Sequence, residues 1–170
     1  GEIQNNLPNG KGKLSRFLCY PIYEGHFKDG EFNGSGKFFW DDGAYYKGDF
    51  IDGKKHGTGF LKMPNGEFYE GDFNNENICG KGSFQMIDGS KYIGEFKDCK
   101  KSGIGKEYYH GDILKYEGEY KEDKFNGKGA LYTEPENQIN FIGNFIDGKP
   151  IIEIVNKIGY QKLNNTKKKN

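Results

Sequence analysis

The chain has 170 residues and balances 25 basic against 25 acidic residues, so its formal net charge is zero. A neutral chain lacks the field that steers proteins onto nucleic acid, and we expect no nucleic-acid partner. Aromatic residues reach 16%, which argues against disorder, whereas a hydrophobic content of 34% is too low for a thick two-layer core. Together with 27 glycines, this composition favours a thin sheet in which aromatic rings cover glycines.

A leading partial repeat with Gly10 and Gly12 begins near Asn9, five full repeats follow from Tyr23, and a partial last repeat begins at Phe141. An aromatic residue opens each repeat at steps of 23 residues, and the last two steps lengthen to 24 and 25. These opening residues are Tyr23, Tyr46, Tyr69, Tyr92, Tyr116 and Phe141. Two residues after each stands a glycine, and two further on a second aromatic: Phe27, Phe50, Phe73, Phe96, Tyr120 and Phe145. Self-similarity at a fixed period predicts a repeat array over residues 9–149.

Each repeat is predicted to be one β-hairpin. Residues 69–73 alternate aromatic or glycine with charged side chains, and this period of two is typical of a strand. A turn signal such as Asp52-Gly53 follows, and a Gly-x-Gly pair such as Gly57 and Gly59 opens the second strand. Successive hairpins are therefore expected to extend one antiparallel sheet, which makes the fold all-β, elongated and a single layer thick.

The alternation also sorts the side chains between two faces of the sheet. The Tyr, Gly and Phe of a first strand share a face with the glycine pair of the second, so that rings can fill the holes that glycines leave. The opposite face is expected to be solvated, because acids of first strands lie beside lysines of second strands. The acids are Glu24, Asp49, Glu70, Asp72, Glu95 and Glu119, and the lysines are Lys37, Lys62, Lys81, Lys106 and Lys128.

The end of the chain departs from the repeat. Ile151, Ile154, Val155 and Ile158 fall at helical spacing and predict a short amphipathic capping helix within residues 150–163. Gly159 weakens a helix there, so a terminal strand is the alternative. Either element would cover the open edge of the last hairpin. Residues 164–170, which include three lysines, are predicted to be disordered.

The unit YxGxFxxGxxxGxGxhxxxxGxx resembles the MORN repeat (membrane occupation and recognition nexus). The match is best at 23–45 and 46–68, and Glu76, Cys99 and Asp123 stand where the pattern has a turn glycine. The resemblance implies an elongated half-pipe that serves as a scaffold in cytoskeletal, cortical or membrane-junction assemblies. It also implies binding of a partner helix or peptide along the groove, dimerisation in some members, and a proposed role at membranes or phosphoinositides.

Aromatic side chains are predicted to line a groove for a partner helix or peptide, because aromatics are favoured interface anchors. Trp40, Phe39, Tyr45 and Phe68 lie outside the strict repeat pattern and are the better candidates for specific contacts. Repeat-defining rings complete the predicted groove: Tyr23, Phe27, Phe38, Tyr46, Phe50, Tyr69, Phe73, Tyr92, Phe96 and Tyr116. The alternative is that these repeated rings only hold the sheet together.

Two further hypotheses about function are alternatives to partner binding in the groove. The first is binding to a membrane or phosphoinositide, an anionic lipid that would meet the basic cluster of the tail. This cluster consists of Lys157, Lys162, Lys167, Lys168 and Lys169. The second follows from the first residue, Gly1, which is not Met: we expect further sequence, and the repeats would then be an accessory region of a longer enzyme. A homodimer would fit each hypothesis.

No arrangement of residues predicts catalysis, a metal site or a cofactor. His26, His56 and His110 fall at different positions of the repeat. His56 and Cys79 share a position one repeat apart, but two strand spacings of about 9–10 Å are too long for one metal ion. The Gly-x-Gly pairs never extend to a phosphate-binding GxGxxG between a strand and a helix. The carboxylates lie on a flat face without a pocket to desolvate them for acid–base work.

The cysteine pattern and the distribution of apolar residues indicate where in the cell the chain is expected. Cys19, Cys79 and Cys99 are odd in number and lack CxxC spacing, which favours reduced thiols over a disulfide framework. No apolar stretch approaches the roughly 20 residues of a membrane span. We therefore expect a cytoplasmic chain at the cytoskeleton or at the cytoplasmic face of a membrane.

Overall fold

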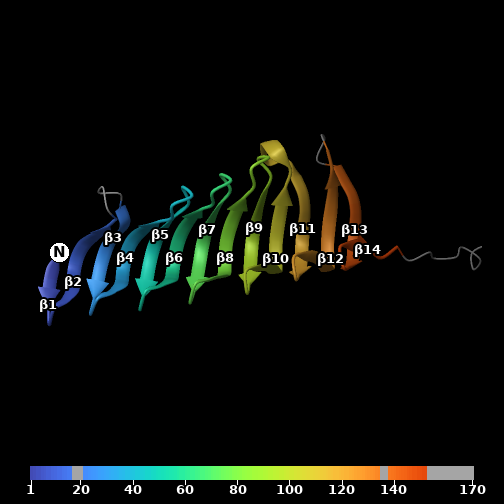
Figure 1. Cartoon of the computed structure of the whole chain (residues 1–170). Coiled ribbons are helices and arrows are strands. Elements are labelled where there is room, and N and C mark those ends of the chain that lie inside the picture. The colour runs from blue at the N-terminus through green and yellow to red at the C-terminus, as the bar shows by residue number, and fades with distance from the viewer. Residues whose placement is uncertain (17–20, 135–137, 153–170) are drawn as a thin grey trace, which may run out of the picture.

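The computed structural model describes residues 1–16, 21–134 and 138–152, and these form one antiparallel sheet. Its fourteen described strands pair in sequence order from β1 to β14, each with the next along the chain. Figure 1 shows them as a single row, with β1 at one end and β14 at the other. The all-β, elongated, single-layer fold predicted from the sequence is confirmed.

Most strands are seven to ten residues long, and those at the two ends of the sheet are shorter. Their bounds are β1 Glu2–Gln4, β2 Leu7–Ser15, β3 Pro21–Lys28, β4 Glu31–Phe39, β5 Tyr45–Ile51, β6 Lys54–Lys62, β7 Phe68–Asn74, β8 Asn77–Gln85, β9 Lys91–Lys97, β10 Lys100–Tyr108, β11 Leu114–Lys121, β12 Lys124–Thr133, β13 Gln138–Ile146 and β14 Lys149–Pro150. A short 3-10 turn, His110–Asp112, lies in the loop between β10 and β11.

Tight turns close the hairpins and also join each hairpin to the one before it. Asp52 and Gly53 have φ values of 48° and 75°, the left-handed pair that a two-residue hairpin turn requires. The Gly53 N–H donates a hydrogen bond of 2.9 Å to the Phe32 carbonyl of the preceding hairpin. The same bond recurs from Glu76 to Lys55 at 3.0 Å. Each turn is thus fastened to the previous repeat.

Acidic side chains reinforce this junction where they replace the turn glycine. Glu76 and Asp123 keep the left-handed conformation, with φ values of 74° and 67°. Glu76 Oε1 accepts a hydrogen bond from the Lys55 N–H at 2.6 Å, and Asp123 Oδ1 accepts one from the Lys101 N–H at 2.8 Å. These bonds offset the roughly 1–2 kcal/mol that a non-glycine residue costs in this conformation.

The core of the sheet consists of tyrosine rings that lie on paired glycines. Tyr69 has no exposed surface, and it covers Gly71 and Gly82, which face each other across β7 and β8. Its hydroxyl donates a hydrogen bond of 3.2 Å to the Asp72 carbonyl. Rings of the same and of the next repeat pack edge-on against it, with the Phe96 centroid 5.2 Å away. This contact makes the core continuous from hairpin to hairpin.

The first glycine of each Gly-x-Gly pair has a different task. The β7–β8 ladder shifts register after Gly71, and at this bulge Gly80 has a φ of 56°, which glycine adopts freely. The Asp72 carboxylate accepts a hydrogen bond from the backbone N–H of Lys81 at 2.9 Å. Asp72 was expected to face lysine side chains in solvent. Its observed partner is the backbone of the bulge.

The predicted limits of the array differ from the sheet at both ends. On the N-terminal side the sheet extends beyond Asn9, because β1 pairs with β2. At the other end Lys149–Pro150 forms β14, and the Ile151 N–H donates to the Asn144 carbonyl at 2.8 Å. A short strand therefore occupies the start of the predicted 150–163 cap. The remainder of that cap and the predicted disordered tail at 164–170 lie outside the described residues.

The glycine under each tyrosine ring should be indispensable for stability. A Cβ at Gly82 would overlap the ring of Tyr69, which is held between its hydroxyl bond and the neighbouring Phe rings. We expect Gly82→Ala to lower the free energy of unfolding by about 1–3 kcal/mol, the usual cost of overpacking. Urea denaturation followed by circular dichroism measures the change.

The matched control is Ser83→Ala, one residue along β8 and on the opposite face. This variant should stay within about 0.5 kcal/mol of the parent chain. Equal stability of Gly82→Ala and Ser83→Ala would show that the ring does not depend on the glycine.

Candidate partner-binding surfaces

The aromatic residues predicted for one groove lie on two different faces of the sheet. Adjacent strand residues point to opposite faces, so Tyr45 and Tyr46 cannot share one. Tyr46 lies with Tyr23, Tyr69 and Tyr92 on what we term the tyrosine face. Phe39, Tyr45 and Phe68 lie on the other, termed the polar face, where β5 sets Tyr45 opposite Phe39. The prediction of a single groove is wrong for these three residues, because their register positions have the opposite parity.

Most repeated rings on the tyrosine face are buried within the sheet itself. Tyr23, Tyr46, Tyr69 and Tyr92 are 0% exposed, and Phe50, Phe73 and Phe96 are also buried. Phe27 is partly buried and packs edge-on against Tyr23 at 5.1 Å. These rings have little surface left to offer a partner. Their geometry matches the alternative reading, in which the repeated aromatics hold the sheet together.

Burial also fixes the protonation state of the tyrosines. It raises the pKa of Tyr116 to about 12, and the nearby Glu119 carboxylate acts in the same direction. Burial likewise raises the pKa of Tyr46 and Tyr69, opposed only in part by the backbone bonds that their hydroxyls make. The hydroxyls therefore stay neutral donors to backbone carbonyls at physiological pH, and they are not available as bases.

A strip of partly exposed apolar side chains runs across the tyrosine face near its loop edge. Phe38, Leu61 and Phe84 occupy equivalent positions in three successive hairpins and pack beside the tyrosines. Two residues after each, the alternation continues with another apolar residue. We term this set of six the apolar strip: Phe38, Trp40, Leu61, Met63, Phe84 and Met86. Only Phe38 and Trp40 were predicted as site residues, although the sequence also shows an apolar residue four positions after the Gly-x-Gly pair in each of these three hairpins.

Trp40 is the most accessible ring of the strip. It is 37% exposed and packs edge-on against Phe38, with ring centroids 4.8 Å apart. Beside it lies a hollow of about 270 Å³ whose walls are mostly aromatic. Lys55 borders this hollow, with its ammonium 5.4 Å from the Trp40 ring and 2.6 Å from Glu76. The hollow therefore has aromatic walls and, at its rim, the Lys55–Glu76 ion pair, which has no net charge.

The strip ends at a charged cluster in the following hairpin. Glu107 occupies the position that Phe38, Leu61 and Phe84 hold in the preceding hairpins. It is only 9% exposed, and its carboxylate pairs with the ammonium groups of Lys101 and Lys115 at 2.6 Å each. Burial alone would raise the pKa of Glu107. The hydrogen bonds from the two lysines outweigh burial and hold that pKa below its ordinary value.

Because its pKa is lowered by folding, Glu107 should stabilise the protein only where it is ionised. We expect Glu107→Gln to reduce the free energy of unfolding at pH 7 by about 1–3 kcal/mol, the usual worth of charged hydrogen bonds. The difference in unfolding free energy between the two proteins should reach its maximum above pH 4.5, the ordinary pKa of a glutamate. It should vanish as the pH falls through the lowered pKa of Glu107. Urea denaturation of both proteins across pH 3–7 measures it. A difference that does not change with pH would contradict the linkage.

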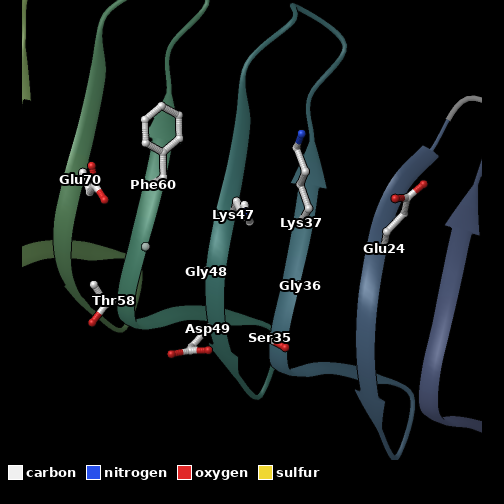
Figure 2. A pocket seen from close by; sticks show the side chains of 11 residues that line it. Glu24, Ser35, Gly36, Lys37, Lys47, Gly48, Asp49, Thr58, Phe60 and Glu70 are labelled. Carbon is white, nitrogen blue, oxygen red and sulfur yellow. The ribbon is translucent and has the colours of Figure 1, made fainter.

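The polar face carries a ladder of stacked aromatic rings, which the sequence analysis had assigned to the groove in part. Phe60, which was not predicted, stacks between Tyr45 at 5.7 Å and Phe68 at 5.4 Å, and Phe39 extends the ladder on the Tyr45 side. The Lys37 ammonium lies 4.0 Å from the centre of the Tyr45 ring. Figure 2 shows Phe60 on β6 and Lys37 on β4, with Lys47 of β5 between them; all three line a broad hollow of this face.

Charge pairing on the polar face is sparser than predicted. Glu24 pairs with Lys13 at 2.6 Å, and Lys106 pairs with Glu117 at 2.8 Å. Glu119 instead accepts a bond of 2.9 Å from the backbone N–H of Lys128, as Asp72 does from Lys81 two repeats earlier. The face is solvated as expected. The acids of first strands form ion pairs with lysines in some repeats and accept hydrogen bonds from backbone N–H groups in others.

The remaining predictions concern chemistry and membranes. Within the described ranges no group of three or more His, Cys, Asp or Glu side chains could hold a metal ion. Cys79 and Cys99 are free thiols. None of the described elements is a helix long and apolar enough to cross a membrane. The basic cluster predicted as a lipid site, Lys157, Lys162, Lys167, Lys168 and Lys169, lies wholly outside the described residues.

Comparison with known families agrees with this architecture. A family model described as the MORN repeat matches six consecutive segments: 1–16, 23–45, 46–68, 69–91, 92–111 and 116–132. Each matched segment contains most or all of one hairpin, and the first segment corresponds to β1 and β2. No curated protein matches the chain.

Proposed function

Because the chain belongs to the MORN-repeat family, we propose that it is a protein-binding scaffold whose apolar strip receives an amphipathic helix of a partner. MORN repeats are generally interaction repeats for proteins or membranes, and the family is typically non-catalytic. They are often associated with membranes or the cytoskeleton. We place this scaffold in a cytoskeletal or membrane-cortex assembly on that ground.

The observation that carries the proposal is the partly exposed apolar strip on a face whose repeat-opening tyrosines are fully buried. Phe38, Leu61 and Phe84 pack against the buried tyrosines and still keep part of their surface exposed. Trp40 at one end is a large ring that binding would desolvate, which is typical of interface anchors. Met63 and Met86 add flexible, polarisable side chains that adapt to a partner surface.

The dimensions of the sheet favour a helix over an extended peptide. Neighbouring strands lie about 4.8 Å apart, so equivalent residues of successive hairpins are about 9.6 Å apart across the sheet. Seven residues of an α-helix rise about 10.5 Å. A helix lying across the strands therefore presents one heptad to each hairpin, with a drift of about 1 Å per repeat. The three hairpins of the strip match three heptads.

Truncation of two strip residues should weaken partner binding while the fold survives. We expect the Trp40→Ala, Met63→Ala double variant to bind the helical segment of a partner captured from source-cell lysate at least about thirtyfold more weakly, as loss of interface anchors implies. Isothermal titration calorimetry with that segment measures the change, and circular dichroism checks the fold.

The control is a double variant of the polar face, Tyr45→Ala and Phe68→Ala, which removes two rings of the aromatic ladder. This variant should retain parental affinity. If the polar-face variant loses the partner and the strip variant keeps it, the binding face is the other one.

Membrane or phosphoinositide binding is the competing function, and the accessory region of a longer enzyme is compatible with either. Co-flotation with vesicles that contain phosphatidylinositol phosphate distinguishes the two modes. The strip variant should float no differently from the parent chain if lipid is bound through the basic tail. A chain that floats with vesicles but captures no protein would favour the lipid function.

A further inference from the structure

The hairpin that follows the apolar strip is built differently from the three before it. Its equivalent positions carry Glu107 in place of an aliphatic or aromatic residue, and Tyr109 in place of Trp or Met. Lys101 and Lys115 converge on Glu107, and Tyr120 lies beside them with its hydroxyl 3.5 Å from the carboxylate. In three hairpins the strip is apolar, and in the fourth it is ionic.

An irregularity of the backbone places Lys115 in this cluster. The repeat that begins at Tyr92 is 24 residues long, one more than the three before it. The β10–β11 ladder absorbs the extra residue as a bulge, with Glu107 opposite Tyr116 but Tyr108 opposite Leu114. Lys115, which falls between these pairs, has its ammonium beside Glu107 on the tyrosine face. The inserted residue thus adds a cation where the regular repeat has none.

In this cluster two ammonium groups share one carboxylate, while the neighbouring Asp123 carboxylate accepts from the Lys101 backbone N–H at 2.8 Å. Glu107 is buried and shared between two lysines. The Lys101 side chain is 16% exposed, and its ammonium lies against the rings of Tyr92 and Tyr120. Lys115 is 34% exposed and lies over Tyr109, so its ammonium is the part of the cluster that a partner would meet. An apolar group laid over it would desolvate an ammonium whose one carboxylate partner is shared with Lys101.

We propose that the Lys101–Glu107–Lys115 cluster fixes the register and direction of the bound helix by accepting a carboxylate one heptad beyond three apolar heptads. This inference rests on the proposed function, since it assigns a partner chemistry to the same face. The apolar strip supplies affinity at three equivalent positions and by itself permits shifts of one repeat. The partner is an amphipathic helix with apolar residues in three heptads and Asp or Glu facing the fourth hairpin.

The test uses designed four-heptad helical peptides and the full chain. The peptides carry leucines in three consecutive heptads and differ in the single residue that faces the fourth hairpin: Glu, Gln or Lys. Fluorescence anisotropy measures the three dissociation constants. We expect the Glu peptide to bind at least about tenfold more tightly than the Lys peptide, with the Gln peptide between them, and the difference to shrink with added salt.

Variants of the cluster should change this preference without removing binding. Lys115→Gln should bring the Glu and Gln peptides to similar affinity, and Lys115→Glu should favour the Lys peptide. The matched control is Lys106→Gln, which removes a lysine of the same strand pair from the polar face, where it pairs with Glu117. This control should keep the parental preference. Circular dichroism verifies that each variant folds, and Lys115→Gln alone suffices if the charge reversal does not.

Direction is tested by moving the acid to the opposite end of the peptide and placing a photo-crosslinker next to it. In the parent chain the crosslinks should form near Tyr109 and Lys115 whichever end carries the acid. Binding of all three peptides with equal affinity, or crosslinks that ignore the acid, would overturn this inference and leave the proposed function standing. Failure of every peptide to bind would remove the proposed helix site itself.

Discussion

The structure depends on one contact, a tyrosine ring lying flat on two glycines that face each other across a hairpin. A single-layer sheet has no second layer to bury its side chains, so each ring must find its cover within the sheet. Glycine brings the ring onto the backbone, and the Phe or Tyr of the next repeat closes over its edge, as Phe73 does for Tyr46 at 5.0 Å. Stability therefore resides in neighbouring pairs of hairpins, as in other linear repeat proteins.

The same contact explains what the sequence reveals readily. A period of 23 residues, the Gly-x-Gly pairs and the alternating first strands together specify hairpins and their order, because a ring such as Tyr69 fits nowhere except over Gly71 and Gly82. The parity of side chains is also in the sequence, since Tyr45 and Tyr46 are neighbours in one strand. The single predicted groove failed because it grouped rings by their departure from the repeat. Departure from the repeat does not determine which face a side chain occupies.

Other features depend on tertiary geometry that no local pattern encodes. Glu76 at a turn position that favours glycine suggests backbone strain. Its carboxylate, however, binds both the backbone N–H and the ammonium of Lys55, and so links its turn to the preceding hairpin. Likewise, a 24-residue repeat signals an insertion without showing that β11 absorbs it as a bulge beside Glu107. Once a bulge shifts the register, alternation no longer predicts the face of the residues around it. The Lys101–Glu107–Lys115 cluster could therefore be recognised only in three dimensions.

A repeated surface creates a problem of specificity that a compact domain does not have. Equivalent residues recur about every 9.6 Å, so a helix bound to the apolar strip gains similar contacts when it slides by one hairpin. Two irregular ends limit this degeneracy: Trp40, whose ring is larger than Met63 or Met86, and the ionic cluster around Glu107. A misplaced helix would bury Lys115 against apolar groups, and that cost discriminates more sharply than a lost methyl contact. In this protein the regular positions form the sheet, and the irregular ones are suited to select what binds to it and in which direction.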